Sequence, residues 1–311
     1  MLPETRLLLS RWTDYNLLDS GGGQKLERFG RHTFIRPEVQ AMWQRALPDR
    51  DWLAAEACFN PTGEESGGHW DYKKKIAEKW EMTYDLEPGT ATDRHVIRFW
   101  AQTTGGRHLG VFPECASHWD WIHAQITSRR DRQVNVLNLF GYTGLATLAA
   151  AAAGAKVTHL DASRKSVDWA RQNQVLSGLL DAPVRWIVDD AVRFVQREAR
   201  RGVKYDGIVL DPPKFGRGPK GEVWEVFRSL PVLLQACRQV LNENPLFVVL
   251  TVYAVKASPV HLRCLLEELM KGSGGFLGCG ELVTREASAG RLLSQAVYAR
   301  WAGTSPVRDK E

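Results

Sequence analysis

With 311 residues the chain has room for about two domains, and its 44% hydrophobic and 25% charged residues exclude a mainly disordered or collagen-like protein. The formal net charge of +5 is compatible with a nucleic-acid partner without requiring one. No apolar run approaches the roughly 18 residues that a membrane span needs, and residues 1–12 lack the apolar core of a signal peptide, so we expect a cytoplasmic protein without a membrane partner.

The first part of the chain is predicted to consist mainly of strands and turns. Apolar and polar side chains alternate over residues 80–85, which is the period of a half-buried strand. A second extended run covers residues 95–102, and the turn signal Pro88-Gly89 lies between the two. The pair predicts a β-hairpin, and we expect a smaller β-rich recognition domain at residues 1–104.

The remainder of the chain alternates short apolar runs with segments of helical period. This alternation predicts an α/β fold with a doubly wound parallel sheet, which binds ligands beyond the carboxyl ends of its strands. The expected strands are residues 134–139, 156–160, 184–188, 205–210, 246–253 and, closing the chain, 292–301.

Two of these strands end in groups that suit a nucleoside. After the first strand, Asn138 to Gly144 contains a GxxG spacing, whose glycines let the backbone turn tightly and approach a ligand. An ordinary strand–helix turn stays an alternative there. Asp161 follows the second strand, and its two oxygens can accept both hydroxyl hydrogens of a ribose. It could instead serve only the start of the next helix, near Ser163.

The third strand is followed by two carboxylates, Asp189 and Asp190, and then by Ala191 at the start of a helix. We expect Asp190 to accept a hydrogen bond from an adenine amine. Asp189 is assigned the less specific role of a negative charge near a helix N-terminus.

The fourth strand ends in Asp211-Pro212-Pro213-Lys214-Phe215. Two consecutive prolines fix the backbone and remove two N–H donors, so the loop carbonyls and the Asp211 carboxylate can face an amine-bearing substrate. Phe215 offers a flat face on which a base could stack. A merely rigid turn is the alternative interpretation.

Together these strand ends resemble the class I S-adenosylmethionine-dependent methyltransferases, and more closely the large-subunit ribosomal RNA methyltransferase I group. The resemblance also covers residues 19–30, 110–114 and 119–122, and so extends over most of the chain. It implies a seven-stranded Rossmann-like methyltransferase domain at residues 105–311, S-adenosylmethionine as cofactor and RNA as partner. It further implies that Phe112 and Glu114 approach the cofactor.

The candidate residues fall into two groups, with no metal site among them. Catalysis is assigned to Asp211, Pro212, Pro213, Lys214 and Phe215. Cofactor binding is assigned to Phe112, Glu114, Asn138, Phe140, Gly141, Tyr142, Thr143, Gly144, Asp161, Ala162, Ser163, Asp189, Asp190, Ala191 and Asp211.

One departure from the family bears on the atom that is methylated. Members that make 5-methylcytosine use a cysteine after strand five, where this chain has Leu250 to Val255 without a cysteine. Cys237 fits the apolar stripe of a helix, and Cys264 falls within the next one. We therefore expect methylation of a nitrogen in RNA rather than of cytosine C5.

Several alternatives stay open at this point. The acceptor could be a protein side chain or a small molecule, and the chain could be a non-catalytic nucleoside-binding module or an NAD-dependent oxidoreductase. Lys214, Arg217 and Lys220 could contact phosphates or form a solvated loop. Tyr253 could be a wall or hydroxyl partner of the site, or simply a buried strand residue.

Overall fold

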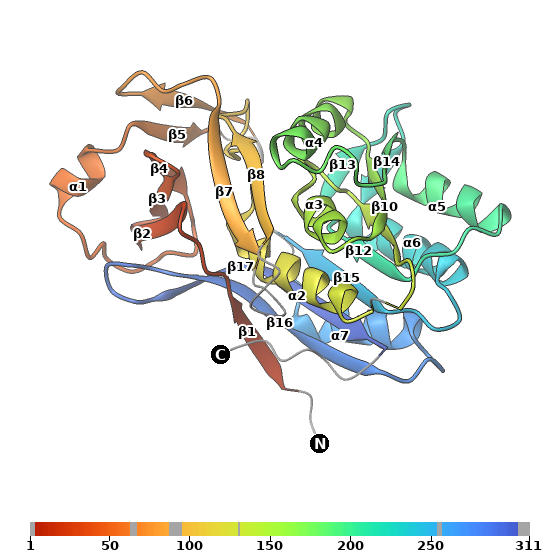
Figure 1. The fold of residues 1–311 in the computed structure, drawn as a ribbon. Coiled ribbons are helices and arrows are strands. Elements are labelled where there is room, and N and C mark those ends of the chain that lie inside the picture. The colour runs from red at the N-terminus through yellow and green to blue at the C-terminus, as the bar shows by residue number, and fades with distance from the viewer. Residues whose placement is uncertain (1–3, 63–66, 87–94, 130, 254–256, 304–311) are drawn as a thin grey trace.

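The computed structural model describes residues 4–62, 67–86, 95–129, 131–253 and 257–303. A mixed sheet of eight strands, in the order β1-β16-β17-β15-β12-β9-β10-β11, forms its centre, with helices packed on it (Figure 1). Its strands are β1 (Thr5–Leu9), β16 (Phe276–Arg285), β17 (Leu292–Ala302), β15 (Phe247–Val252), β12 (Gly207–Leu210), β9 (Asn135–Leu139), β10 (Lys156–Asp161) and β11 (Val184–Val188). The predicted α/β sheet is confirmed.

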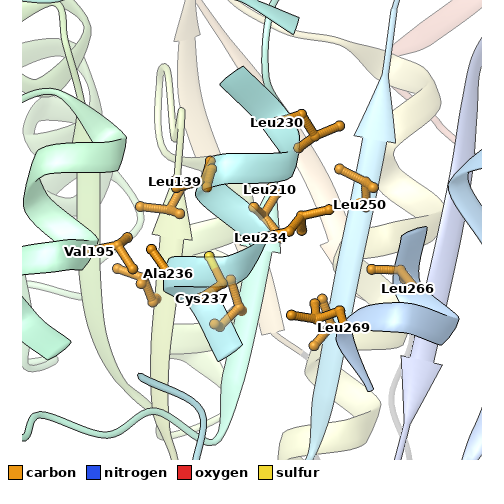
Figure 2. Close-up of a cluster of buried hydrophobic side chains, with 14 of the residues drawn as sticks. Leu139, Val195, Leu210, Leu230, Leu234, Ala236, Cys237, Leu250, Leu266 and Leu269 are labelled. Atoms are coloured by element: carbon orange, nitrogen blue, oxygen red, sulfur yellow. The ribbon is translucent and has the colours of Figure 1, made fainter. Parts of the chain in front are cut away.

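Helices connect the parallel strands, as their apolar periodicity predicted. They are α2 (Ala116–Thr127), α3 (Leu145–Ala152), α4 (Arg164–Leu176), α5 (Ala191–Arg200), α6 (Val226–Val240) and α7 (Pro259–Leu269), with a 3₁₀ turn η1 (Pro113–Cys115) before α2. The strands β12 and β15 are buried along their whole length, which is typical of parallel strands covered on both faces. Leu230, Leu234 and Cys237 of α6 pack into this core (Figure 2), so the core position predicted for Cys237 is confirmed.

Helix starts follow the capping residues that the sequence indicates. The Ser163 hydroxyl accepts from the Ser166 amide at the start of α4, and Ser258 forms a capping box at α7. At α5 the expectation needs a correction. Asp190, not Asp189, takes the helix N-terminal role, because its side chain accepts a hydrogen bond from the backbone of Arg193.

The large sheet has eight strands, whereas the resemblance implied seven. The extra strand is β1, which lies in the stretch assigned to the β domain and pairs in parallel with β16, from Thr5 opposite Cys279 to Leu9 opposite Val283. Within β1 Leu8 is buried, while Leu7 and Leu9 are exposed. A pattern of only five residues is too short to predict which strand β1 pairs with. The boundary at residue 104 stays a prediction.

The rest of the first hundred residues forms smaller sheets beside the large one (Figure 1). A five-stranded sheet contains β2 (Tyr15–Gly21), β3 (Gln24–Phe29), β4 (His32–Pro37), β5 (Ala57–Pro61) and β6 (Gly68–Tyr72), with the short helix α1 (Asp49–Leu53) between β4 and β5. The predicted hairpin is present as β7 (Trp80–Leu86) and β8 (His95–Ala101). Its predicted turn at Pro88-Gly89 lies outside the described residues.

Two sets of contacts join these smaller sheets to the α/β part. The β7–β8 hairpin packs on α4. There Trp169 Nε1 donates to the carbonyl of Trp100 at 3.0 Å, and the Asn173 side chain accepts from the amide of Trp100. The turn between β16 and β17 reaches β2, where the amide of Ala287 donates to the carbonyl of Leu17. In the described ranges no helix is both long and apolar enough to cross a membrane.

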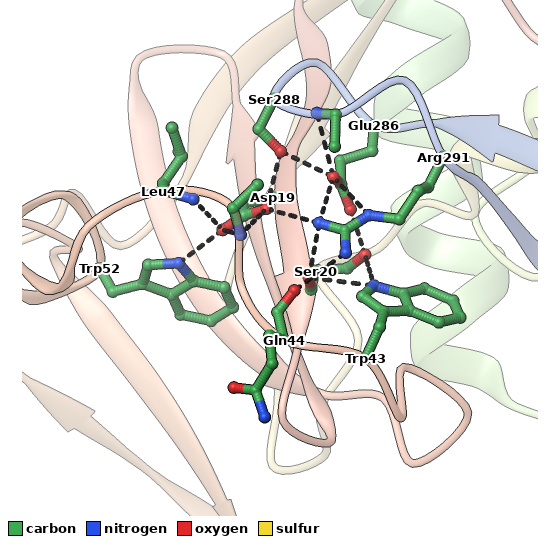
Figure 3. A network of polar contacts seen from close by, with 11 residues as sticks. Asp19, Ser20, Trp43, Gln44, Leu47, Trp52, Glu286, Ser288 and Arg291 are labelled. Carbon is green, nitrogen blue, oxygen red and sulfur yellow. Dashed lines mark hydrogen bonds and ion pairs between the residues drawn. The ribbon is translucent and has the colours of Figure 1, made fainter.

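A buried polar network secures the second junction (Figure 3). We call it the junction cluster, and it consists of Asp19, Ser20, Glu286, Ser288 and Arg291. The Ser288 hydroxyl lies 2.7 Å from an oxygen of each carboxylate, and Arg291 contacts both of them. Because all four carboxylate oxygens of Asp19 and Glu286 accept hydrogen bonds, this cluster can hold the β16–β17 turn against β2 without an unsatisfied carboxylate.

Candidate active site

The carboxyl ends of β9, β10, β11, β12 and β15 open into one cavity of about 1520 Å³. Its wall includes most of the predicted site residues, namely Phe112, Glu114, Phe140, Tyr142, Asp161, Ala162, Ser163, Asp189, Asp190, Ala191, Asp211, Pro213 and Lys214. Of the four strand ends expected around one pocket, Asp161, Asp190 and Asp211 line this cavity, whereas Gly141 does not.

The loop after β9 carries backbone strain at this cavity. Phe140 and Tyr142 both have positive φ, 58° and 48°, in the left-handed region that costs about 1–2 kcal/mol for a non-glycine residue. Tertiary contacts hold both residues in this conformation. The ring centroids of Phe140 and Trp224 are 4.8 Å apart, and the Tyr142 amide donates to Asp161 Oδ2. Such strain is typical of loops whose shape serves a site.

The wall does not include Asn138, Gly141, Thr143, Gly144, Pro212 or Phe215. The structure explains the two glycines by close packing within the protein rather than by the approach of a ligand. A Cβ at Gly141 would collide with the ring of His159, and one at Gly144 would come within 2.8 Å of Ala170 on α4. The glycines make room for the protein itself.

The polar residues of the same loop are likewise engaged with protein. Asn138 donates to Thr147 at 2.9 Å, and the buried Thr143 hydroxyl donates to the carbonyl of Gly110 at 2.7 Å. Phe215 is 54% exposed and points away from the interior. Their predicted contacts with cofactor or substrate stay predictions.

Asp161 is held by its own backbone surroundings. Its Oδ1 accepts from the amide of Ser163 at 2.8 Å and its Oδ2 from the amide of Tyr142 at 2.9 Å. Burial raises the pKa of this carboxyl, while the two amides act in the opposite direction. Each oxygen has a further lone pair, so a pair of vicinal hydroxyls could donate to this carboxylate from the cavity.

The two carboxylates after β11 differ in their partners. Asp189 forms an ion pair with Arg197 at 2.6 Å, whereas the Oδ1 of Asp190 accepts from the Arg193 amide at 2.9 Å. Both residues line the cavity. The contact of Asp190 with an adenine amine stays a prediction. In that contact the amine would donate either to Oδ1, which already caps α5, or to the neighbouring Oδ2.

Asp211 lines the cavity, and one of its carboxylate oxygens is unsatisfied. Its Oδ1 is shielded from solvent and has no hydrogen-bond partner among the described residues. Burial raises the pKa of Asp211 well above its usual range, the neighbouring Glu114 carboxyl adds to the effect, and a hydrogen bond from the Tyr253 hydroxyl opposes it. A buried acceptor without a donor is costly in a folded protein, so this oxygen is positioned for a donor supplied by a ligand.

A group that the sequence did not reveal lies behind Asp211. The Cys115 thiol and the Tyr253 hydroxyl are 2.7 Å apart, although 138 positions separate them in the chain. Burial and the neighbouring Asp211 raise the pKa of Cys115 and of Tyr253 well above their usual values. Cys115 and Tyr253 therefore both lie close enough to Asp211 for its carboxyl to influence their ionisation.

Beside them Glu114 is buried, with its pKa raised by burial against the opposing charges of Lys25 and Arg36. We call Glu114, Cys115, Asp211 and Tyr253 the cavity cluster. In it burial raises the pKa of all four ionisable groups. Tyr253 is thus a hydroxyl partner of the site, one of the two roles considered for it from sequence.

The backbone after Asp211 differs from the expected open loop. Residues 215–225 form a hairpin of β13 (Phe215–Arg217) and β14 (Val223–Glu225). The Pro213 carbonyl, which was expected to face an amine, accepts from Trp224 Nε1 at 2.7 Å. Asp211 is then the acceptor of this segment that faces the cavity.

The smaller sheets contribute a wall that sequence reasoning missed. Lys25, Arg36 and His108 line the cavity, with Arg36 bound at 2.7 Å to both oxygens of Glu27. Burial, together with the nearby Arg36, lowers the pKa of His108 to about 3, so its ring is neutral. Lys25 lies within residues 19–30, which carry part of the family resemblance, but tertiary packing is what brings all three positions to the cavity.

Comparison with known proteins agrees with this geometry. Residues 37–256 match a family model described as S-adenosylmethionine-dependent methyltransferase. Among curated proteins, the ribosomal RNA large subunit methyltransferase K/L of Pseudoalteromonas atlantica is 36% identical over 236 residues, covering 75% of this chain and 31% of that protein. The ribosomal RNA large subunit methyltransferase I of Aeromonas salmonicida is 37% identical over 123 residues, covering 39% of this chain and 28% of that protein.

Solved structures extend the likeness to the whole chain. A SAM-dependent methyltransferase from Agrobacterium tumefaciens is 45% identical with a TM-score of 0.88, covering 97% of this chain and 96% of that one. A Streptococcus mutans structure shares the fold, with a TM-score of 0.68 at 17% identity over 94% of this chain and 76% of that one. The chain spans about a quarter to a third of the length of the curated relatives it matches.

Proposed function

The chain belongs to the S-adenosylmethionine-dependent methyltransferase family, and from this premise we propose that it methylates RNA, at a nitrogen atom of a base. The RNA acceptor is supported by the names of the curated relatives, which are ribosomal RNA large subunit methyltransferases. The nitrogen acceptor is supported by the unsatisfied oxygen of Asp211. A cytoplasmic location is part of the same proposal.

The residues along the sheet edge fit the cofactor. Asp161 can accept from the ribose hydroxyls, Asp189 and Asp190 lie where the adenine would reach, and Phe112 and Tyr142 have their rings 5.7 Å apart at the cavity wall. S-adenosylmethionine supplies a methyl group on a positively charged sulfur, which a nitrogen lone pair can attack directly. The neutral carboxyls of the cavity cluster can ionise when a positive charge arrives, and so stabilise it.

Asp211 is the residue that would orient the acceptor. An exocyclic amine that donates one hydrogen to Asp211 is held in a fixed orientation, in which its nitrogen lone pair, normal to the plane of the amine, can face the methyl group. The Tyr253 hydroxyl acts on the same carboxyl group and lowers its pKa. Asp211 can then accept the proton that leaves the nitrogen, because its pKa in this environment lies well above the ordinary value.

Cytosine C5 is the second candidate acceptor, because Cys115 lies beside Asp211. A thiolate is needed to add to C6, and burial raises the pKa of Cys115, so the thiol form is favoured. Replacement of Cys115 by serine separates the two cases. A nitrogen methyltransferase keeps most of its activity in this variant, whereas an enzyme that uses the thiolate loses it.

Calorimetric titration tests the cofactor assignment. We expect S-adenosylmethionine and S-adenosylhomocysteine to bind wild-type protein, NAD not to bind, and Asp161→Asn to weaken both complexes. Binding of NAD alone would contradict the assignment.

Mass spectrometry of ribosomal RNA from cells with and without the protein tests the acceptor. A methylated base nitrogen that disappears with the protein supports the proposal. Loss of a C5-methylated cytosine instead, or no change in RNA with a change in a protein or small molecule, would overturn it.

A further inference from the structure

The β13–β14 hairpin has an exposed apolar face next to the cavity mouth. In its register Phe215 lies opposite Glu225 and Arg217 opposite Val223, so these four residues share one face, with Gly216 and Trp224 on the other. Phe215 is 54% exposed and Val223 61%. The opposite face is closed, because Trp224 is buried there.

The first turn of α6 follows the hairpin directly. Phe227 is 62% exposed, and it also forms part of the cavity wall together with Arg217 and Gly216. Two exposed phenylalanines thus lie on consecutive elements, one on the hairpin and one at the cavity itself. Large apolar side chains exposed together next to a site indicate a binding surface rather than an incidental exposure.

The charges of the same segment favour an anionic partner. Arg217, Lys220 and Arg228 are exposed, and within the described part of the chain their side chains form no ion pair. The two acidic residues nearby are engaged: Glu222 pairs with Arg193, and Glu225 caps α6 by accepting from the amides of Phe227 and Arg228. The surface therefore presents aromatic rings among unpaired positive charges.

We propose that Phe215 and Phe227, flanked by Arg217 and Arg228, bind the unpaired nucleotides next to the target base, so that the substrate is single-stranded RNA. This inference rests on the proposed function. Aromatic rings can stack on bases only where these are not already stacked in a duplex, and arginines beside them can contact the phosphates. Because Phe227 also lines the cavity, the strand would be continuous with the base that enters it.

Fluorescence anisotropy with labelled RNA tests this surface. The probes are a 15-nucleotide single strand and a duplex of the same sequence, with S-adenosylhomocysteine present. We expect wild-type protein to bind the single strand at least tenfold more tightly than the duplex. The double variant Phe215→Ala, Phe227→Ala should bind the single strand about 10- to 100-fold more weakly, since loss of a stacked ring typically has an effect of this size.

Two controls make the result specific. Phe276→Ala removes an equally exposed phenylalanine, 51% exposed on β16, and should leave RNA affinity unchanged. Calorimetric affinity for S-adenosylhomocysteine should be the same in every variant, which reports that the proteins are folded.

Three outcomes would overturn the inference: equal binding of duplex and single strand, unchanged affinity in the double variant, or an equal loss in Phe276→Ala. If wild-type protein binds S-adenosylhomocysteine but neither RNA, the proposed RNA acceptor fails as well. If the protein binds RNA but the affinity does not depend on Phe215 and Phe227, the proposed RNA acceptor still holds and only the proposed binding surface is contradicted.

Discussion

The junction cluster and the cavity cluster are both buried groups of carboxyls, but they differ in whether their acceptors are satisfied. In the junction cluster the Asp19 carboxylate accepts from the amide of Leu47 and the indole of Trp52, and it also contacts Ser288 and Arg291 (Figure 3). In the cavity cluster, Asp211 Oδ1 has no partner among the described residues.

The pKa shifts of the two clusters have opposite signs. Burial acts to raise the pKa of Asp19 and of Glu286, but hydrogen bonds and Arg291 outweigh it, so both values are lowered. Burial raises the pKa of Asp211 and of Glu114, and no sufficient set of donors compensates it. The comparison teaches that a satisfied buried cluster stabilises the fold, whereas an unsatisfied carboxyl in a cavity wall is a candidate for contact with a ligand.

The largest expected effect is on stability, from Asp19→Asn. Asparagine keeps one acceptor oxygen, but its NH2 group would face donors, either the Leu47 amide and the Trp52 indole or Ser288 and Arg291. We expect the free energy of unfolding to fall by roughly 3 kcal/mol. Urea unfolding measures the change. Asp168→Asn, at an exposed position of α4, is the matched control and should change stability by less than about 0.5 kcal/mol. An equal effect of both variants would contradict the role of the junction cluster.

Asp211→Asn should lower activity without lowering stability. We expect methyl transfer to fall by roughly 100-fold, because a charge-assisted hydrogen bond to the acceptor is lost, while stability does not fall and cofactor affinity is retained. Initial rates and calorimetry provide the two measurements. Turnover close to that of wild type would contradict the role of Asp211, and a large loss of stability would place it with the junction cluster instead.

The pH dependence of stability should distinguish the two clusters by sign. The folded-state pKa of Asp211 is raised, so wild-type protein loses stability as pH rises from the unfolded value near 4 toward the raised value. Over that range Asp211→Asn should gain on wild type by about 1 kcal/mol per pH unit. Below pH 4 the lowered pKa values of Asp19 and Glu286 make wild-type protein lose stability as pH falls. A stability difference between Asp211→Asn and wild type that does not change with pH would contradict this account.

The smallest effect is expected from Tyr253→Phe. Removal of the hydroxyl takes away a hydrogen bond that lowers the pKa of Asp211, so the acidic limb of the pH–rate profile should move to higher pH. The rate at neutral pH should fall by about tenfold or less. Tyr72→Phe, at an exposed tyrosine of β6, should leave the profile unchanged. If the pH–rate profile of Tyr253→Phe is the same as that of wild type, the Tyr253 hydroxyl has only a structural role.

The sequence predicted those parts of the molecule that local patterns determine. Strand ends such as Asp161 and Asp211 follow directly from the alternation of strands and helices, since parallel strands bring their carboxyl ends to one edge. The family and its cofactor, inferred from the resemblance, are confirmed by the comparisons. Ser163 and Ser258 as helix caps were equally local.

Long-range contacts account for what could not be predicted. The contact of Cys115 with Tyr253 joins positions far apart in the chain, and β1 chooses β16 as its neighbour only in the assembled sheet. The glycines of the first loop look like ligand contacts in sequence, but Gly141 faces His159. A local pattern gives the chemistry of a residue but not the direction in which it points.

The most direct test of the account is a crystal structure of the protein with S-adenosylhomocysteine and the acceptor nucleoside. We predict that the ribose hydroxyls lie within hydrogen-bond distance of Asp161 and that the acceptor nitrogen lies within hydrogen-bond distance of Asp211 Oδ1, in the same cavity. An adenosine bound elsewhere, or an Asp211 Oδ1 that still has no donor in the complex, would contradict the assignment of the cavity cluster as the reacting site.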